Sequence, residues 1–143
     1  MLISTKGRYA LRVMIDLAEH QTDGYIPLKE VAQRQDISEK YLETIIRLLV
    51  KANILSGLRG KGGGYKLTKS PDQYTVGAIL RLTEDSLAPV SCLGPGAAVC
   101  ARAAECRTLH MWQGLYKVIN EYLDNVTIAD LMKSGAAGDN YVI

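Results

Sequence analysis

The sequence predicts a mainly α fold in which two short helices and a basic β-hairpin are followed by a long C-terminal helix. Apolar residues recur with helical spacing in two short segments, 27–35 and 38–53, which are separated by a tight break. The glycine-rich stretch "GKGGG" then separates two segments with strand patterns. An apolar stripe with helical spacing follows in residues 107–125. These three observations fix the order of the expected elements.

The composition is that of one globular unit whose charge is unevenly divided. The 143 residues are 48% hydrophobic and 22% charged, which suits a packed core. Residues 1–70 carry twelve Lys/Arg against seven Asp/Glu, a net charge of +5, whereas residues 71–143 carry five against eight, a net charge of −3. A basic first half indicates a polyanionic partner. No apolar run approaches the ~20 residues of a membrane span and no export signal is seen, so we expect a cytoplasmic protein with no membrane partner.

The first half is expected to contain three helices. The first covers residues 5–20, where one face is apolar. Pro27 occupies the first turn of the second, a position that tolerates its missing N–H. After the tight break "DI", Ser38 is a good N-cap for the third helix, 38–53.

The third helix has one apolar side and one polar side. The side expected to be buried contains Leu42, Ile45, Ile46, Leu48 and Leu49. The open side contains Ser38, Glu39, Lys40, Glu43, Thr44 and Arg47. Two short helices joined by a tight turn, with the second polar at its exposed N-terminal end, match the helix-turn-helix, whose second helix enters the major groove of DNA. A plain helical hairpin in a bundle is the alternative.

The hairpin that follows favours the DNA-binding interpretation. "ILSGLR" and "YKLTK" read as two strands around the glycine turn, and Arg59 and Lys61 lie at its tip. A basic tip of this kind can contact phosphates or enter a minor groove. A nucleotide-binding phosphate loop is excluded, because the G-x-x-x-x-G-K-[ST] spacing is missing and no helix follows the glycines. The sequence therefore predicts a winged helix-turn-helix with a two-stranded β-wing.

The second half is expected to contain a dimerisation helix. A short helix at "VGAILRLTED" leads to a Gly/Pro/Ala-rich loop, and the long helix follows; Thr127 and Asp130 then form the capping box of a final short helix. The stripe of the long helix needs a partner, and DNA readers of this size usually work as two-fold dimers on palindromic sites. Folding back on its own domain is the alternative. The residues assigned to dimerisation are Trp112, Leu115, Val118, Ile119, Tyr122 and Leu123. The predicted division of the chain is a DNA-binding domain at 1–84, a cysteine-bearing loop at 85–106, and the dimerisation helix and tail at 107–143.

All three cysteines of the chain lie in that loop. Cys92, Cys100, Cys106 and His110 have the spacing C-x7-C-x5-C-x3-H. A zinc site is chemically possible, but the loop contains no C-x2–4-C knuckle. A disulfide switch and unreactive thiols are two further alternatives. An iron–sulfur cluster suits thiolates on a wide loop that can surround a bulky inorganic core.

Several of these segments together resemble the Rrf-type bacterial regulators. They are "STKGRYALRVMIDLA", "ISEKYLETIIRLLVKANIL", "RGKGGGYKL", the three-cysteine loop and "NVTIADL", and they cover nearly the whole chain in the family's order. The resemblance implies a homodimeric winged helix-turn-helix protein that binds double-stranded DNA operators. It also implies the contact residues: the recognition helix would use Ser38, Lys40, Tyr41, Glu43 and Thr44, the wing would use Arg59, and the DNA backbone would meet Ser4, Thr5 and Lys6. Glu43 can accept a hydrogen bond from a cytosine amino group, which would give sequence preference.

Family members with three cysteines bind an iron–sulfur cluster, and the resemblance implies one here. In the iron–sulfur cluster regulators a histidine three residues after the last cysteine completes the site. This chain has Leu109 there, and its first two cysteines are two residues further apart than in that pattern. His110 can serve as the fourth ligand if the long helix starts after it; otherwise a residue from elsewhere in the chain, or from the other subunit, completes the site. A histidine ligand favours a 2Fe–2S centre over 4Fe–4S.

The function predicted is that of a repressor-type transcriptional regulator that senses iron–sulfur cluster status and controls cluster biogenesis genes. One alternative is a cluster-free regulator of cysteine metabolism that acts with a metabolic enzyme as partner, which the closing "GDNYVI" resembles. Another is a nitric oxide sensor of the same family, although those members use an acid near the start of the first helix and "KGR" has none. An enzyme is not expected, because no paired carboxylates, nucleophile triad or nucleotide loop is present.

Overall fold

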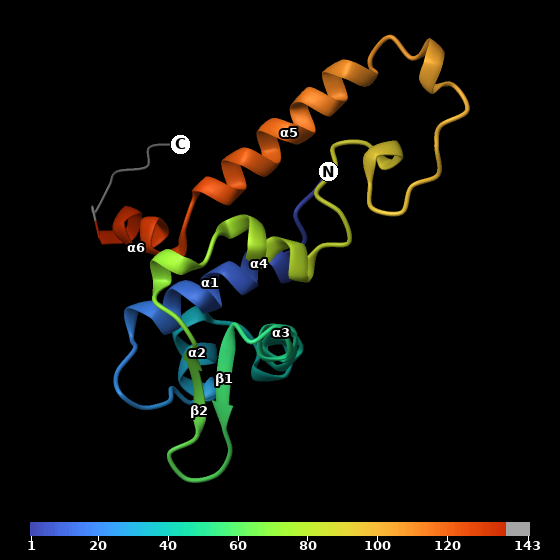
Figure 1. Cartoon of the computed structure of the whole chain (residues 1–143). Helices are drawn as coiled ribbons and strands as arrows, with labels where there is room; N and C mark the ends of the chain where they lie inside the picture. The colour runs from blue at the N-terminus through green and yellow to red at the C-terminus, as the bar shows by residue number, and fades with distance from the viewer. Residues whose placement is uncertain (137–143) are drawn as a thin grey trace.

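The structure, a computed structural model, describes residues 1–136. Residues 137–143, which include the closing segment "GDNYVI", lie outside the described residues. The start of the predicted tail, residues 133–136, belongs to the last helix. The described part is mainly helical, with a single two-stranded sheet (Figure 1). Three short 3-10 turns connect its elements, which are α1 (Thr5–Glu19), α2 (Leu28–Gln35), α3 (Glu39–Lys51), β1 (Leu55–Leu58), β2 (Gly64–Leu67), α4 (Val76–Thr83), α5 (Leu109–Asn125) and α6 (Ile128–Ala136).

Helix α1 is the centre of the core. The side predicted to be apolar is buried, and it packs against α2, α3, α4, α6 and β2. The α3 residues Leu42, Ile45 and Leu49 are fully buried against it, whereas Leu48 is only half-buried. Ile128 of α6 is also fully buried in the same cluster. The first 70 residues and α6 therefore share one hydrophobic core.

The turn between α2 and α3 is short and specific. Pro27 is the N-cap of α2 and lies just outside it, where the prediction had placed this residue in the first turn. Helix α2 ends at Asp36, whose left-handed backbone (φ 52°) lets the chain reverse. The Ser38 hydroxyl then accepts a hydrogen bond from the Tyr41 backbone N–H at 3.1 Å, as an N-cap should. The predicted helix-turn-helix is confirmed.

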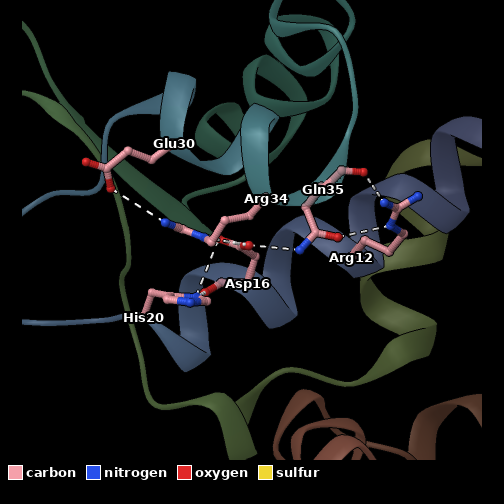
Figure 2. Close-up of polar contacts among 6 residues, drawn as sticks. All are labelled: Arg12, Asp16, His20, Glu30, Arg34 and Gln35. Carbon is pink, nitrogen blue, oxygen red and sulfur yellow. Dashed lines mark hydrogen bonds and ion pairs between the residues drawn. The ribbon is translucent and has the colours of Figure 1, made fainter.

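A buried carboxylate fixes α2 against α1. Asp16 is fully buried, and Arg34 donates to both of its oxygens, with the shortest bond 2.7 Å long (Figure 2). Gln35 donates a further hydrogen bond of 2.8 Å to the same carboxylate. Its side-chain oxygen in turn accepts from Arg12 at 3.0 Å. Asp16 thus anchors the last turn of α2, which sets where the following helix begins.

The wing is tied to the body at its base. Strands β1 and β2 pair antiparallel from Leu55 opposite Leu67 to Leu58 opposite Gly64. Tyr65 and Ile26 exchange backbone hydrogen bonds of 2.8 and 2.9 Å, so the segment before α2 extends the hairpin by one bridge. Gly64 is needed there, because a Cβ on it would lie 2.1 Å from the Ile26 carbonyl oxygen. The wing base is fixed while its tip projects away from the core (Figure 1).

Helix α5 leaves the core and the chain then returns to it. In Figure 1 this helix projects away from the other helices, and the cysteine loop lies at its far end. After α5, backbone bonds join Val76 to Val126 (2.8 Å) and Ile128 to Tyr74 (2.9 Å). The predicted capping box is present: Thr127 and Asp130 exchange hydrogen bonds of 2.9 and 3.1 Å. The division of the chain at residues 84 and 106 stays a prediction, but α6 packs in the core of the first segment.

No helix in residues 1–136 combines the length and the hydropathy that crossing a bilayer requires.

Candidate nucleic-acid interface and cysteine loop

The N-terminal part of α3 presents a polar face to solvent. Its predicted contact residues are all exposed, including the Tyr41 ring at 37%. Tyr41 packs edge-on against Tyr9 of α1, with 5.8 Å between ring centroids, and the Arg12 guanidinium lies over the other ring. These contacts orient Tyr41 beside the helix start. The exposed contact residues are Ser38, Lys40, Tyr41, Glu43 and Thr44.

The start of α1 lies beside the start of α3. Thr5 and Tyr41 line the same surface hollow, so the two helix ends lie on the same side of the molecule. Thr5 is exposed and Lys6 is half-buried. The first N–H groups of a helix have no intrahelical acceptor and favour an anion such as a phosphate.

Ser4 is more occupied than the sequence predicted. It is the N-cap of α1 and accepts a hydrogen bond from the Gly7 N–H at 3.1 Å. Its hydroxyl donates to Glu84 at 2.6 Å, and its backbone N–H donates to the other carboxylate oxygen at 3.2 Å. Glu84, 80 positions later in the chain, thus fixes the N-terminal end of α1. A Cβ at position 7 would lie 2.2 Å from Glu84 Oε1, which explains the glycine there.

The wing tip carries its two predicted cations into solvent. Arg59 and Lys61 are exposed, and Gly60 and Gly62 beside them have φ values of 89° and 76°. Those left-handed conformations let the hairpin reverse without strain. The tip can therefore follow a nucleic-acid surface beside α3.

The cysteine loop is open and unbridged. Cys92, Cys100 and Cys106 are free and exposed. Within residues 1–136, no three His, Cys, Asp or Glu side chains converge as a ready-made metal site. The structure thus places the predicted ligands on one loop without bringing them together. His110 lies in the first turn of α5, because the helix begins at Leu109 and not after the histidine.

The surroundings of Cys106 favour its thiolate form. The pKa of Cys106 is lowered because the Thr108 hydroxyl lies 3.5 Å from its sulfur and stabilises the thiolate, with the backbone N–H groups of Thr108 and Leu109 and the charge of Arg102 adding to this. A larger thiolate fraction makes a cysteine a better metal ligand and a better nucleophile.

The apolar stripe of α5 is divided between two surroundings. One edge is open: Val118 is 59% and Tyr122 68% exposed. The other edge packs on its own domain, where Leu123 contacts a cluster formed by Val76, Leu80 and Leu87. Tyr116, which the sequence reasoning missed, packs there too; its i, i+7 relation to Leu123 was the available signal. The packed edge matches the predicted alternative of folding back on its own domain, and dimerisation through the open edge stays a prediction.

The comparisons with known proteins agree with this geometry. The profile of the Rrf2 family, described as "Iron-dependent Transcriptional regulator", matches residues 3–134. The HTH-type transcriptional regulator IscR of Erwinia tasmaniensis is 36% identical over 134 residues, which is 94% of this chain and 80% of that protein. IscR of Sodalis glossinidius is 37% identical over the same shares.

Solved structures of two regulators have the same fold. CymR, the global cysteine regulator of B. subtilis, has a TM-score of 0.75 at 36% identity and covers 94% of this chain and 98% of its own. IscR of T. potens has a TM-score of 0.74 at 36% identity, over 98% of this chain and 92% of its own. With the winged helix-turn-helix in place, the chain belongs to the Rrf2 family of DNA-binding transcriptional regulators, which are not enzymes.

Proposed function

We propose that this protein is an IscR-like repressor that binds palindromic operators as a homodimer and responds to an iron–sulfur cluster, controlling genes for cluster biogenesis. The observation that carries the proposal is the placement of all three thiols. They are exposed on one loop that joins the DNA-binding unit to α5. An exposed, unpaired thiol contributes nothing to a core, so packing does not account for this cluster of cysteines.

The chemistry of the loop fits a cluster. Thiolates are the usual ligands of iron–sulfur centres, and Cys106 already has a lowered pKa. Cys92, Cys100 and Cys106 would hold the irons. His110, which lies in the first turn of α5, would become the fourth ligand of a 2Fe–2S centre only if that turn opens; otherwise a residue from elsewhere in the chain or from the other subunit would complete the site. Since these side chains do not converge in the described residues, the loop must close to bring them together. The bound cluster would supply a redox-sensitive and oxygen-sensitive reporter of iron and sulfur supply.

The loop is connected to both functional surfaces through this chain's own residues. It begins directly after Glu84, which holds the N-terminus of α1 through Ser4. It ends at α5, whose open edge includes Val118 and Tyr122. A change in loop conformation can therefore alter the position of α1 and the angle between two subunits.

The direct test is anaerobic reconstitution with iron and sulfide. We expect visible charge-transfer absorption that is lost when Cys92, Cys100 and Cys106 are each replaced by Ala. The His110→Ala variant should keep the absorption but shift its spectrum and its reduction potential. Retention of the wild-type spectrum by all three cysteine variants would rule the cluster out. Operator binding, measured with and without the cluster, shows whether it controls repression.

A second candidate is a cluster-free cysteine regulator that acts with a metabolic enzyme. The fold similarity to CymR, with a TM-score of 0.75, supports it only weakly, since IscR of T. potens has nearly the same TM-score and the sequence relatives at 36 and 37% identity are IscR regulators. The two candidate functions differ in the role of the exposed thiols, which bind an iron–sulfur cluster only in the first. Anaerobically isolated protein without iron, together with co-purification of an enzyme, would support this second function.

A further inference from the structure

A cleft separates the outer side of α3 from the wing. It has a volume of about 460 Å³, and three cations line it: Arg47 and Lys51 from α3, and Arg59 from the wing. Its apolar part includes Leu58, which is 48% exposed, and Tyr65. No carboxylate lines this cleft. Neither the helix-turn-helix pattern nor the family resemblance assigned Arg47 or Lys51 a role.

These three cations have no internal partner in the part of the chain that the structure describes. None of them takes part in an ion pair or a side-chain hydrogen bond within residues 1–136. Two other arginines are engaged: Arg34 bonds Asp16 and Arg81 bonds Asp124. Cations that converge on a cleft without a carboxylate fit an external anion.

The position of the cleft identifies the anion. Arg47 lies one turn after Glu43 and Thr44, so it continues the face of α3 that would enter the major groove. The wing would lie in the adjacent minor groove. The sugar–phosphate strand that separates these two grooves must then pass between α3 and the wing.

We propose that this cleft holds that DNA strand, with Arg47 and Lys51 contacting its phosphates beside Arg59. The inference rests on the proposed binding of operators through α3 and the wing. Leu58 and Tyr65 supply the apolar surface for the sugars between phosphates. Because phosphates are the same at every position, these contacts add affinity and register without sequence preference. Arg47 and Lys51 thereby differ in role from Glu43.

The test compares Arg47→Gln, Lys51→Gln and the double variant with the wild type. Lys117→Gln on α5 is the matched control, since it removes an exposed cation far from the cleft. Operator affinity is measured by fluorescence anisotropy at several salt concentrations. Each cleft substitution should weaken binding about 3- to 10-fold at low salt and reduce the slope of log K against log[salt] by about one. The loss should be equal on operator and unrelated duplexes, while Lys117→Gln behaves as the wild type.

Neutral methylphosphonates placed between the major-groove half-site and the adjacent minor groove identify the contact directly. They should weaken the wild type but have little further effect on the double variant. Wild-type salt slopes in both cleft variants, or an undiminished methylphosphonate effect in the double variant, would overturn the assignment. Wild-type protein that fails to bind any duplex would instead refute operator binding itself. Thermal unfolding of each variant checks that the fold is retained.

Discussion

The Ser4 hydroxyl donates a 2.6 Å hydrogen bond to Glu84, across 80 positions of the chain. Ser4 is the N-cap of α1, where the candidate nucleic-acid interface begins, and Glu84 is the last residue before the cysteine-bearing loop. A carboxylate at a helix N-terminus is stabilised by the partial positive charge of the unpaired N–H groups. This contact therefore links the loop to α1 without any intervening residue.

Replacing Glu84 by Gln should lower the free energy of unfolding by about 1 kcal/mol, because a charge-assisted bond becomes a neutral one. Asp85→Asn is the matched control: it also removes one negative charge, from an exposed neighbour. Urea unfolding of both variants measures the difference. Equal losses in the two would show that charge, and not the bond to Ser4, stabilises this corner.

Arg34→Ala should lower the free energy of unfolding by about 3 kcal/mol, because it leaves the buried Asp16 carboxylate without its cation. Lys29→Ala removes an exposed cation from the same helix and should cost much less. The measurement is urea unfolding of both variants at neutral pH. A small and equal effect of both substitutions would mean that Gln35 alone satisfies Asp16.

In the metal-free protein, Cys106 should be alkylated by iodoacetamide faster than Cys92 and Cys100 near neutral pH. Its lowered pKa gives it a larger thiolate fraction, and the thiolate is the nucleophile. Thr108→Val removes the hydroxyl that lowers this pKa and should slow alkylation of Cys106 selectively. Mass spectrometry of timed digests gives the three rates. Unchanged rates in Thr108→Val would mean that the backbone N–H groups and the charge of Arg102, and not the hydroxyl, lower the pKa of Cys106.

Asp130→Asn should make the free energy of unfolding depend less on pH in the acidic range. Hydrogen bonding from the backbone N–H of Thr127, and then from its side chain, lowers the pKa of Asp130 below its ordinary value. Its contribution is then complete above the pKa of an unfolded Asp, about 3.9, and is lost as the pH falls through the lower folded pKa. The difference in urea midpoint between wild type and Asp130→Asn should therefore be largest at neutral pH and shrink as the pH falls below the pKa of an unfolded Asp. A difference that stays the same at every pH would mean that the charge of Asp130 does not stabilise this capping box.

Val118→Glu should prevent dimerisation while leaving the monomer folded, because this side chain is 59% exposed on the open edge of α5. Gln113→Glu places the same charge on a different face of the helix and should leave the dimer intact. Sedimentation equilibrium of both variants measures the change. If the Val118→Glu protein were still dimeric, the dimer interface would lie on another surface of the molecule.

Local patterns predicted most of the fold. The Ser38 N-cap, the Thr127–Asp130 capping box and the glycine turn all depend on residues within a few positions of one another, and all are present. The bond from Ser4 to Glu84 joins residues 80 positions apart, and nothing near either residue signals the other. Nothing in the sequence around Asp16 indicates its ion pair with Arg34, because the packing of α2 on α1 brings the two side chains together. The pairing of distant polar groups depends on tertiary packing, which periodicity does not encode.

The same reasoning explains the incomplete prediction at the cysteine loop. Spacing showed that three thiols share one loop, but the distances between them depend on backbone conformations that Gly, Pro and Ala leave open. The start of α5 at Leu109 was within one or two residues of the expected position. That small difference decides whether His110 belongs to the helix or to the loop.

Ile128 lies in the centre of the core, so α6 packs with the first 84 residues although the cysteine loop and α5 separate the two in the sequence. A fragment that stops at residue 84 would lack this side chain and would leave the Tyr74 carbonyl and the Val76 N–H without partners. Chimeras should therefore exchange the cysteine loop and α5 between relatives and keep α6 with the host. Such chimeras would test whether the exchanged segment determines the proposed response to a cluster while the winged helix-turn-helix stays unchanged.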